Sequence, residues 1–250
     1  MYGKDLRLRR IFPGGDRRLF SVPLDHSVSM GPIDGLEATA PVVAELQAAG
    51  ADLFVVTKGA VREVAPVLSR HSLLGVHISA STSLGPNSSH KVLVGNAAEA
   101  VALGADLLSV QVNFGVAEEG AMLADLGTAV DQARSLGLPL MCMSYVKKPT
   151  APTVDDLRHA ARATADLGAD IVKTSYPGSE DGFRAVVRST PVPVLIGGGV
   201  RTDDEAEFLR VVQQSVAAGG AGICIGRNLF QRRPVATLAR RLAAILHPSG

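Results

Sequence analysis

The chain has 250 residues, of which 46% are hydrophobic and 20% are charged, and its formal net charge at pH 7 is +1. This composition can bury one substantial core, and the near-zero net charge argues against binding to nucleic acid or to an anionic membrane surface. No apolar run approaches the roughly 20 residues that a membrane-spanning helix needs, so we expect no membrane partner.

The first 18 residues, MYGKDLRLRRIFPGGDRR, are predicted to form an arm in front of the first strand. They lack the apolar centre of a secretion signal, which favours a cytoplasmic location. The basic run at residues 7–10 is typical of a solvated or subunit-contacting segment, and we expect a homo-oligomer. Cys142 and Cys224 both lie in apolar runs, so we expect two buried, reduced thiols and no cysteine-based metal cluster.

Eight strand candidates follow along the chain. Four belong to a repeated phrase that reads as a helix end, a glycine cap, a short connection and a strand. The copies are AAGADLFVV (48–56), ALGADLLSV (102–110), DLGADIVKT (166–174) and the looser AAGGAGICIG (217–226). The other four strands alternate with these copies, in LFSVPLDH (19–26), GVHIS (75–79), PLMCMSY (139–145) and PVLIGGG (193–199). Helical patterns such as DGLEATAPVVAELQAAG (34–50) and VDDLRHAARATADLG (154–168) separate most of them.

This alternation predicts the fold. Strands that are apolar on both faces and alternate with helices are typical of a parallel sheet covered by helices. Eight such units in about 250 residues match a (β/α)8 TIM barrel. We therefore predict an α/β protein with a single barrel domain over residues 1–250. An open, doubly wound sheet is the alternative, and it would have to explain the near-even eightfold spacing.

Polar residues gather where the predicted strands end. In a barrel, all strand C-termini open at the mouth that carries the active site. The opposite strand ends carry little beyond glycine, alanine and aspartate, which favours a functional mouth over a merely solvated rim. In chain order, the mouth residues are Asp25 and His26, Lys58, His77 and Ser79, Gln111 and Asn113, Ser144 and Tyr145, Lys173 and Ser175, Gly197–Gly199, and Gly226 with Arg227.

The last two strands indicate a phosphate ligand. Glycines at a strand-to-helix junction let backbone N–H groups approach an anion, and the following helix adds its positive end. The segments IGGGVRTDDE (196–205) and CIGRNLF (224–230) place such glycines on the seventh and eighth strands, and Arg227 adds a charged donor. Glycines that only make tight turns are the simpler interpretation. Two such loops on adjacent final strands favour a phosphorylated small molecule.

Lys173 interrupts the sixth strand directly after Ile171 and Val172. A lysine whose amine merely reaches water at a strand end is one interpretation, and a catalytic amine beside the phosphate loop is the other. In apolar surroundings near other cations, its pKa is expected to fall from ~10.4 toward ~7–8. A neutral amine facing a ketone forms a Schiff base. Tyr145 and Asp25 are available on the same rim as acid and base.

Six segments resemble the DhnA-type class I aldolases: VPLDHSVSMGP, HISASTSLGPN, MSYVKK, ADIVKTSYPGSEDGFRAVV, GGGVRTDDEAEFL and AGICIGRNLFQ. The resemblance runs from about residue 8 to residue 246. This family includes archaeal-type fructose-bisphosphate aldolases, 2-amino-3,7-dideoxy-D-threo-hept-6-ulosonate synthases, and actinobacterial aldolases that join dihydroxyacetone phosphate to aspartate semialdehyde.

The resemblance implies a cofactor-free, metal-free aldolase. Lys173 would be the Schiff-base lysine, Tyr145 the proton donor and Asp25 the proton acceptor. The implied substrate contacts are His26, Ser27, Val28, Ser29, His77, Val146, Lys147, Gly198, Gly199, Gly226 and Arg227. Relatives often have Tyr-Pro-Arg where this chain has Tyr145-Val146-Lys147, so the cation is kept but the planar fork of arginine is lost. We therefore expect L-aspartate 4-semialdehyde as the acceptor, with a sugar bisphosphate or the hept-6-ulosonate reaction as alternatives.

Other functions are compatible with some of the same residues. The side chains of His26, His77 and Asp25 are of the kinds that bind zinc or manganese, as in a metal-dependent phosphosugar epimerase or isomerase. The third ligand of such a site is not evident, however, and both histidines are better explained as hydrogen-bonding walls of the pocket. Lys58, in FVVTKGA (54–60), is a rival nucleophile that follows a full strand and is expected to lie nearer to solvent.

Overall fold

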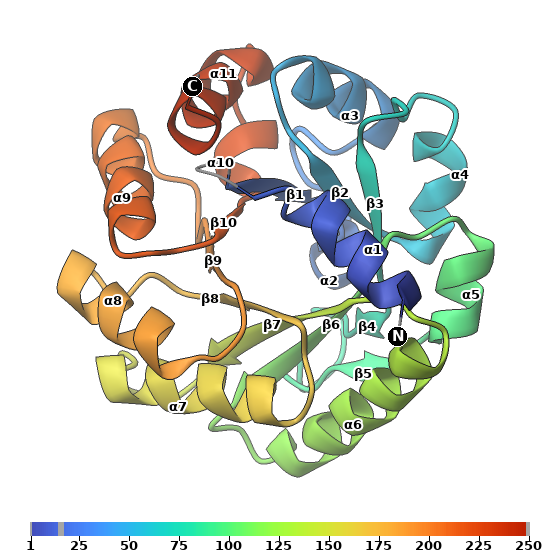
Figure 1. Ribbon diagram of the computed structural model, residues 1–250, viewed down its shortest axis with the longest axis vertical. Helices are drawn as coiled ribbons and strands as arrows, with labels where there is room; N and C mark the ends of the chain where they lie inside the picture. Colours follow the sequence, from blue (N-terminus) through green and yellow to red (C-terminus); the bar gives the residue numbers. More distant parts are fainter. Residues whose placement is uncertain (1, 15–17, 249–250) are drawn as a thin grey trace.

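The computed structural model describes residues 2–14 and 18–248, and these form a closed barrel of eight parallel strands ringed by helices (Figure 1). Around the barrel the order is β1-β10-β9-β8-β7-β6-β3-β2. The closed ring confirms the predicted (β/α)8 barrel and excludes the open sheet. The barrel strands are β1 (Leu19–Pro23), β2 (Leu53–Thr57), β3 (Leu73–His77), β6 (Leu107–Phe114), β7 (Leu140–Val146), β8 (Ile171–Thr174), β9 (Val194–Gly197) and β10 (Gly222–Cys224).

Helices begin where the sequence supplies caps. Thr153 and Asp156 form a reciprocal capping box at the start of α7, and the side chains of Asn96, Ser179 and Asp204 cap three further helices. Nowhere in the described ranges is a helix long and apolar enough to cross a membrane. The helices are α1 (Tyr2–Ile11), α2 (His26–Met30), α3 (Thr39–Ala48), η1 (Lys58–Ala60), α4 (Val61–Val64), α5 (Ala97–Ala102), α6 (Glu119–Ser135), α7 (Val154–Asp166), α8 (Glu180–Ser189), α9 (Glu205–Ala217), α10 (Arg227–Phe230) and α11 (Val235–Leu246).

The buried residues form two cores because successive strand residues face opposite sides of the sheet. In β2, Leu53 and Val55 belong to a small core that includes Leu107, whereas Phe54 belongs to the larger core that includes the helix residue Phe183. Both faces of β2 are thus apolar, as the sequence pattern indicated. Among the described residues, no further apolar layer covers the polar side chains that point into the barrel near its mouth, so these side chains are available to a ligand.

The repeated Gly-Ala-Asp phrase closes the opposite end of the barrel. Each aspartate carboxylate accepts a hydrogen bond from a backbone amide of the preceding strand and thereby links two neighbouring strands. Asp52, Asp106 and Asp170 accept these bonds from Phe20, Leu74 and Leu140 at 2.8, 3.0 and 3.0 Å.

Helix α1 covers this same end of the barrel (Figure 1). Ile11 is 2% exposed and belongs to the small core, Lys4 pairs with Asp170 at 2.5 Å, and Arg10 pairs with Asp106. The Arg7 guanidinium donates to the Gly137 carbonyl at 3.1 Å. Part of the predicted arm is therefore a helix bound to its own barrel, because the repeat aspartates attract its basic residues. Residues 15–17 of the predicted arm lie outside the described residues.

A short antiparallel hairpin, β4 (Ser79–Ala80) with β5 (Val92–Leu93), is inserted after β3 and was not predicted. Its connection lies over the mouth of the barrel. The Ser83 amide donates to the Ser29 carbonyl at 2.9 Å, and the Asn113 side-chain amide donates to the Ser89 carbonyl at 2.6 Å. The hairpin thereby brings residues 81–91 beside α2 and β6.

Candidate active site

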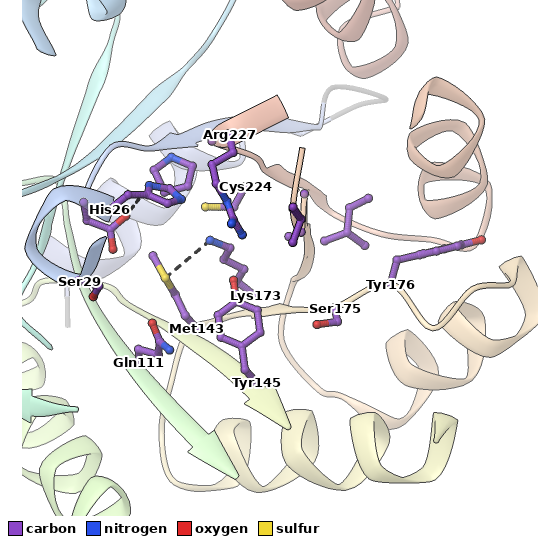
Figure 2. A pocket seen from close by; sticks show the side chains of 18 of the residues that line it. His26, Ser29, Gln111, Met143, Tyr145, Lys173, Ser175, Tyr176, Cys224 and Arg227 are labelled. Carbon is purple, nitrogen blue, oxygen red and sulfur yellow. Dashed lines mark hydrogen bonds and ion pairs between the residues drawn. The ribbon is translucent and has the colours of Figure 1, made fainter. Parts of the chain in front are cut away.

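The mouth of the barrel contains a cavity of about 750 Å³, within the usual range for small-molecule sites. Figure 2 shows side chains from several strands converging on Lys173. Most of the residues predicted from the sequence line this cavity: Asp25, His26, Ser29, Tyr145, Lys147, Lys173, Gly198, Gly199, Gly226 and Arg227.

Four predicted contacts do not line the cavity. Ser27 and Val28 are exposed on α2, because neighbouring helix positions point in different directions while Ser29 faces the cavity. Val146 packs against the larger core, since it alternates with Tyr145 along β7. His77 is 5% exposed and lies behind Asp25 rather than at the cavity surface. The substrate contacts of these four residues therefore stay predictions.

Lys173 lies at the centre of the site. It sits on β8 in register with Met143 of β7, and its side chain is 5% exposed. Its Nζ lies 3.6 Å from the Met143 sulfur and 5.8 Å from the centroid of the Tyr145 ring. A Cβ at Gly197 would lie 3.2 Å from the Tyr145 hydroxyl oxygen and 3.3 Å from Lys173 Cε. Glycine at this position therefore leaves the space that a covalent adduct on Nζ needs.

The charge state of Lys173 differs from the sequence prediction. Burial lowers its pKa, but the negative charges that Cys224, Tyr145 and Asp25 can carry outweigh burial, and the net shift is upward. Burial raises the pKa of both the Cys224 thiol and the Tyr145 phenol, so these two groups are neutral near pH 7. Asp25 is then the charged partner of the ammonium. The expected fall toward ~7–8 assumed cations around the amine, whereas the structure places the ionised Asp25 and two neutral groups beside it, so Lys173 must release a proton before it attacks.

Asp25 is held at the end of β1 between two histidines. Its carboxylate lies 3.6 Å from His77 Nε2 and 3.8 Å from His26 Nδ1, and His77 Nδ1 lies 2.9 Å from the Ser109 hydroxyl. Burial raises the pKa of Asp25, but the nearby His77, His26 and Lys173 lower it by more, so the net shift is downward. Asp25 is therefore ionised near pH 7 and can accept a proton.

The two histidines are neutral near pH 7. Burial lowers the pKa of His26 to about 4, opposed by Asp25, and burial also lowers the pKa of His77. Their roles are therefore hydrogen bonding and packing, and His26 contacts the Phe230 ring edge-on at 5.2 Å.

The two glycine loops are braced by one side chain. Asn228 is fully buried, donates to the Gly198 carbonyl at 2.8 Å and to the Val200 carbonyl at 3.1 Å, and accepts from the Thr202 amide at 3.0 Å. It thus ties the loop after β10 to the loop after β9. A Cβ at Gly198 would lie 2.8 Å from an Ile225 methyl carbon, so larger residues do not fit there.

Arg227 adds an unused donor to these loops. Its Nε is buried and has no hydrogen-bond partner within the described residues, while Figure 2 shows its side chain pointing toward Lys173. A buried guanidinium N–H without a partner is costly. The glycine loops and this donor together offer hydrogen-bond donors that can hold an anion beside the lysine.

Two features of the cavity wall were not among the predicted contacts. Lys91, which comes from the unpredicted hairpin, lines the cavity, as does Cys224. The only sequence signal for Lys91 is a lysine just before the VLV run at 92–94, which resembles an ordinary exposed charge. In the metal alternative three ligands must converge, and the described part of the chain contains no group of three or more histidine, cysteine, aspartate or glutamate side chains that could hold a metal ion.

Comparisons with known proteins agree with this geometry. The family model described as DeoC/LacD family aldolase matches residues 19–232. The chain is 37% identical to the 2-amino-4,5-dihydroxy-6-oxo-7-(phosphonooxy)heptanoate synthase of Streptomyces griseus, over 100% of this chain and 92% of that protein. It is 35% identical to the 2-amino-3,7-dideoxy-D-threo-hept-6-ulosonate synthase of Halobacterium salinarum, over 98% of this chain and 92% of that protein.

Solved structures give the same assignment. An archaeal fructose 1,6-bisphosphate aldolase superposes with a TM-score of 0.88 at 28% identity, covering 97% of this chain and 98% of that one. Another, with its catalytic lysine covalently bound to a carbinolamine intermediate, has a TM-score of 0.87 at 26% identity, covering 97% and 99%. The resemblance noted in the sequence is confirmed, and the metal-dependent alternative is set aside because this chemistry uses a covalent lysine intermediate and needs no metal. The chain belongs to the DeoC/LacD aldolase family and is a class I, Schiff-base-forming aldolase.

Proposed function

We propose that Lys173 is the Schiff-base lysine and that the enzyme joins dihydroxyacetone phosphate to L-aspartate 4-semialdehyde. The observation that carries this proposal is the position of the Lys173 amine. It is buried in the cavity between a neutral phenol and an ionised carboxylate, and it lies next to an anion site formed by two glycine loops and Arg227.

The donor half-reaction follows from these groups. Asp25 accepts the proton that the Lys173 ammonium must lose, and Nζ then attacks the ketone carbon to give a carbinolamine. Tyr145 donates a proton to the departing hydroxyl, so that water leaves and an iminium forms. Asp25 passes the proton that it took from Lys173 to the Tyr145 phenolate, which restores both groups. The iminium acidifies the adjacent C–H, and the ionised Asp25 takes that proton to give an enamine.

The acceptor half-reaction forms the new carbon–carbon bond. The enamine carbon attacks the aldehyde carbon, the developing alkoxide takes the proton held by Asp25, and the iminium is regenerated. Water then hydrolyses the iminium, which frees the Lys173 amine and a seven-carbon amino keto phosphate. One water is released and one is consumed, so the net reaction joins the two substrates.

The phosphate of the donor is assigned to the glycine loops. Backbone N–H groups at Gly198, Gly199 and Gly226 and the unpartnered Nε of Arg227 can each donate to phosphate oxygens. This places the phosphate next to β8, within a few bonds of the carbonyl that Lys173 attacks.

The acceptor is assigned from two observations. Lys147 lines the cavity where relatives often have an arginine, and the Streptomyces griseus relative is named for the product that this pair of substrates would give. A second candidate is fructose 1,6-bisphosphate cleavage, which the names of the structural neighbours favour.

Two measurements test the proposal. Borohydride reduction in the presence of dihydroxyacetone phosphate should add the donor mass to Lys173, located by peptide mass spectrometry. With the donor fixed, kcat/KM for aspartate semialdehyde should exceed that for glyceraldehyde 3-phosphate. A tenfold preference for glyceraldehyde 3-phosphate would assign the bisphosphate reaction instead. The expected homo-oligomer and cytoplasmic location also stay predictions, and sedimentation of the purified protein tests the first.

A further inference from the structure

Lys91 is a second buried lysine at the cavity wall. It is 8% exposed, and its Nζ donates to the Ser29 hydroxyl at 2.8 Å and to the Ser81 hydroxyl at 2.7 Å. The two serines come from different segments, α2 and the hairpin connection. An ammonium group has three N–H donors, so two are used to fix its position and one is left for a ligand in the cavity.

The charge of Lys91 is not neutralised by the protein. Within residues 2–14 and 18–248, no carboxylate lies within ion-pair distance of its Nζ. Burial lowers its pKa, Asp25 raises it, and Lys147 lowers it further. Lys147 lines the same cavity, and a desolvated ammonium that shares a cavity with another cation is unfavourable unless an anion joins them. The pair formed by Lys91 and Lys147 therefore matches a negatively charged ligand.

The barrel places Lys91 across from the phosphate loops, whereas Lys147, which directly follows β7, lies two steps around the ring from β9. The glycine loops follow β9 and β10, and four steps around the ring from these strands lie β3 and β6. Lys91 lies in the insertion after β3, whose connection is bound to Asn113 of β6. In Figure 2, Ser29, which accepts from Lys91, lies on one side of Lys173, and Ser175 lies on the other.

We propose that Lys91, positioned by Ser29 and Ser81 and assisted by Lys147, binds the carboxylate of the acceptor aldehyde and thereby sets acceptor specificity. A substrate whose phosphate occupies the glycine loops and whose carbonyl reaches Lys173 directs its growing end toward this pair. This inference rests on the proposed function, because it takes the lysine chemistry and the two-substrate reaction as given.

A carboxylate fits the pair better than a second phosphate. Lys91 offers one free N–H from a point charge, and Lys147 is exposed. The donor phosphate, in contrast, meets two glycine loops and an arginine. A singly charged group that needs few donors matches the Lys91 side.

The test is a Lys91→Met variant, which keeps the apolar stem and removes the charge. Loss of a charge-assisted hydrogen bond should raise KM for aspartate semialdehyde about 10- to 150-fold. The rate with an uncharged aldehyde such as propionaldehyde should change less than about threefold. Lys148→Met is the matched control, because Lys148 is paired with Asp156 at 2.7 Å outside this cavity, and it should leave both rates unchanged.

Borohydride trapping of the donor separates this inference from the proposed function. If wild type does not trap dihydroxyacetone phosphate at Lys173, the proposed function fails. Suppose that Lys91→Met traps the donor like wild type. If its reaction with aspartate semialdehyde and with propionaldehyde is then weakened equally, or is not weakened with either, the carboxylate assignment is overturned. A larger loss with glyceraldehyde 3-phosphate than with the semialdehyde would show a phosphate site instead. Should Lys91→Met fail to trap donor, Ser81→Ala replaces it, because this variant keeps the charge and removes one positioning bond. It should raise KM selectively for the semialdehyde, and equal effects on both aldehydes would overturn the inference.

Discussion

Replacement of Arg227 by methionine should stabilise the free enzyme while it weakens the reaction. In the free protein, the buried Nε of Arg227 has no partner within the described residues, and an unsatisfied buried donor costs about 1–3 kcal/mol. Arg227 as a whole is only partly buried, so the lower end of that range applies. Methionine keeps an unbranched stem, and a gain of about 1 kcal/mol corresponds to a rise in Tm of roughly 2–4 °C for a chain of this size.

The same substitution removes a donor to the substrate phosphate. A charge-assisted hydrogen bond is worth about 1.5–3 kcal/mol, so kcat/KM for dihydroxyacetone phosphate should fall about 10- to 150-fold. The rate with unphosphorylated dihydroxyacetone should stay within about threefold of wild type. In thermal scans, inorganic phosphate at ten times its Kd should stabilise wild type by about 1.4 kcal/mol and stabilise the variant less.

Arg210→Met is the matched control. Arg210 lies on α9 and pairs with Glu207 outside the glycine loops, so its loss should change neither the donor preference nor the response to phosphate. Equal losses with the phosphorylated and unphosphorylated donors in Arg227→Met would refute the phosphate assignment. A marked fall in Tm would refute the view that the Nε is unsatisfied in the free enzyme.

Further variants test the remaining roles. Lys173→Met should abolish both turnover and borohydride trapping with the fold intact by circular dichroism, whereas Lys58→Met, which removes an exposed ion pair with a glutamate, should keep most of the activity. Tyr145→Phe should lower kcat by roughly 10²–10⁴-fold, and unchanged turnover would remove its role as an acid. The pKa of His26 is lowered to about 4 from 6.5, so the unfolded chain binds more protons between these values. The free energy of unfolding should therefore fall by on the order of 3 kcal/mol as the pH falls from 6.5 toward 4, and this stability is fully present above pH 6.5. Urea unfolding of wild type and His26→Gln at pH 7 and pH 4 should show this difference.

Much of the barrel follows from local sequence patterns. A strand buried on both faces must be apolar throughout, and a helix that stops before such a strand needs a glycine cap. The repeated phrase around Asp52, Asp106 and Asp170 combines these requirements before β2, β6 and β8, and apolar runs between the copies made the remaining strands predictable. Lys173 was equally visible, because a charge inside an apolar strand is costly unless it has a task.

The chemical state of the site was decided by tertiary contacts. The sequence placed Lys173 among cations, but closure of the barrel brings it beside Asp25, Tyr145 and Cys224, and this reverses the direction of its pKa shift. Asp25 follows β1, Tyr145 lies on β7 and Cys224 lies on β10. Because these residues are far apart in the sequence, no local pattern predicts how close they lie to Lys173. The same holds for His77, which spacing assigns to the mouth and which the structure places behind Asp25.

The sequence by itself therefore determined the alternation of strands and helices, the glycine loops and the lysine, because each depends on burial or backbone conformation within one segment. Only the tertiary structure decided that α1 closes the floor of the barrel and that Lys91 reaches the cavity. Both depend on partners far away in the chain: Lys4 and Arg10 on Asp170 and Asp106, and Lys91 on Ser29. A basic residue in a polar segment looks the same whether it is solvated or paired, and only the folded chain supplies the partner.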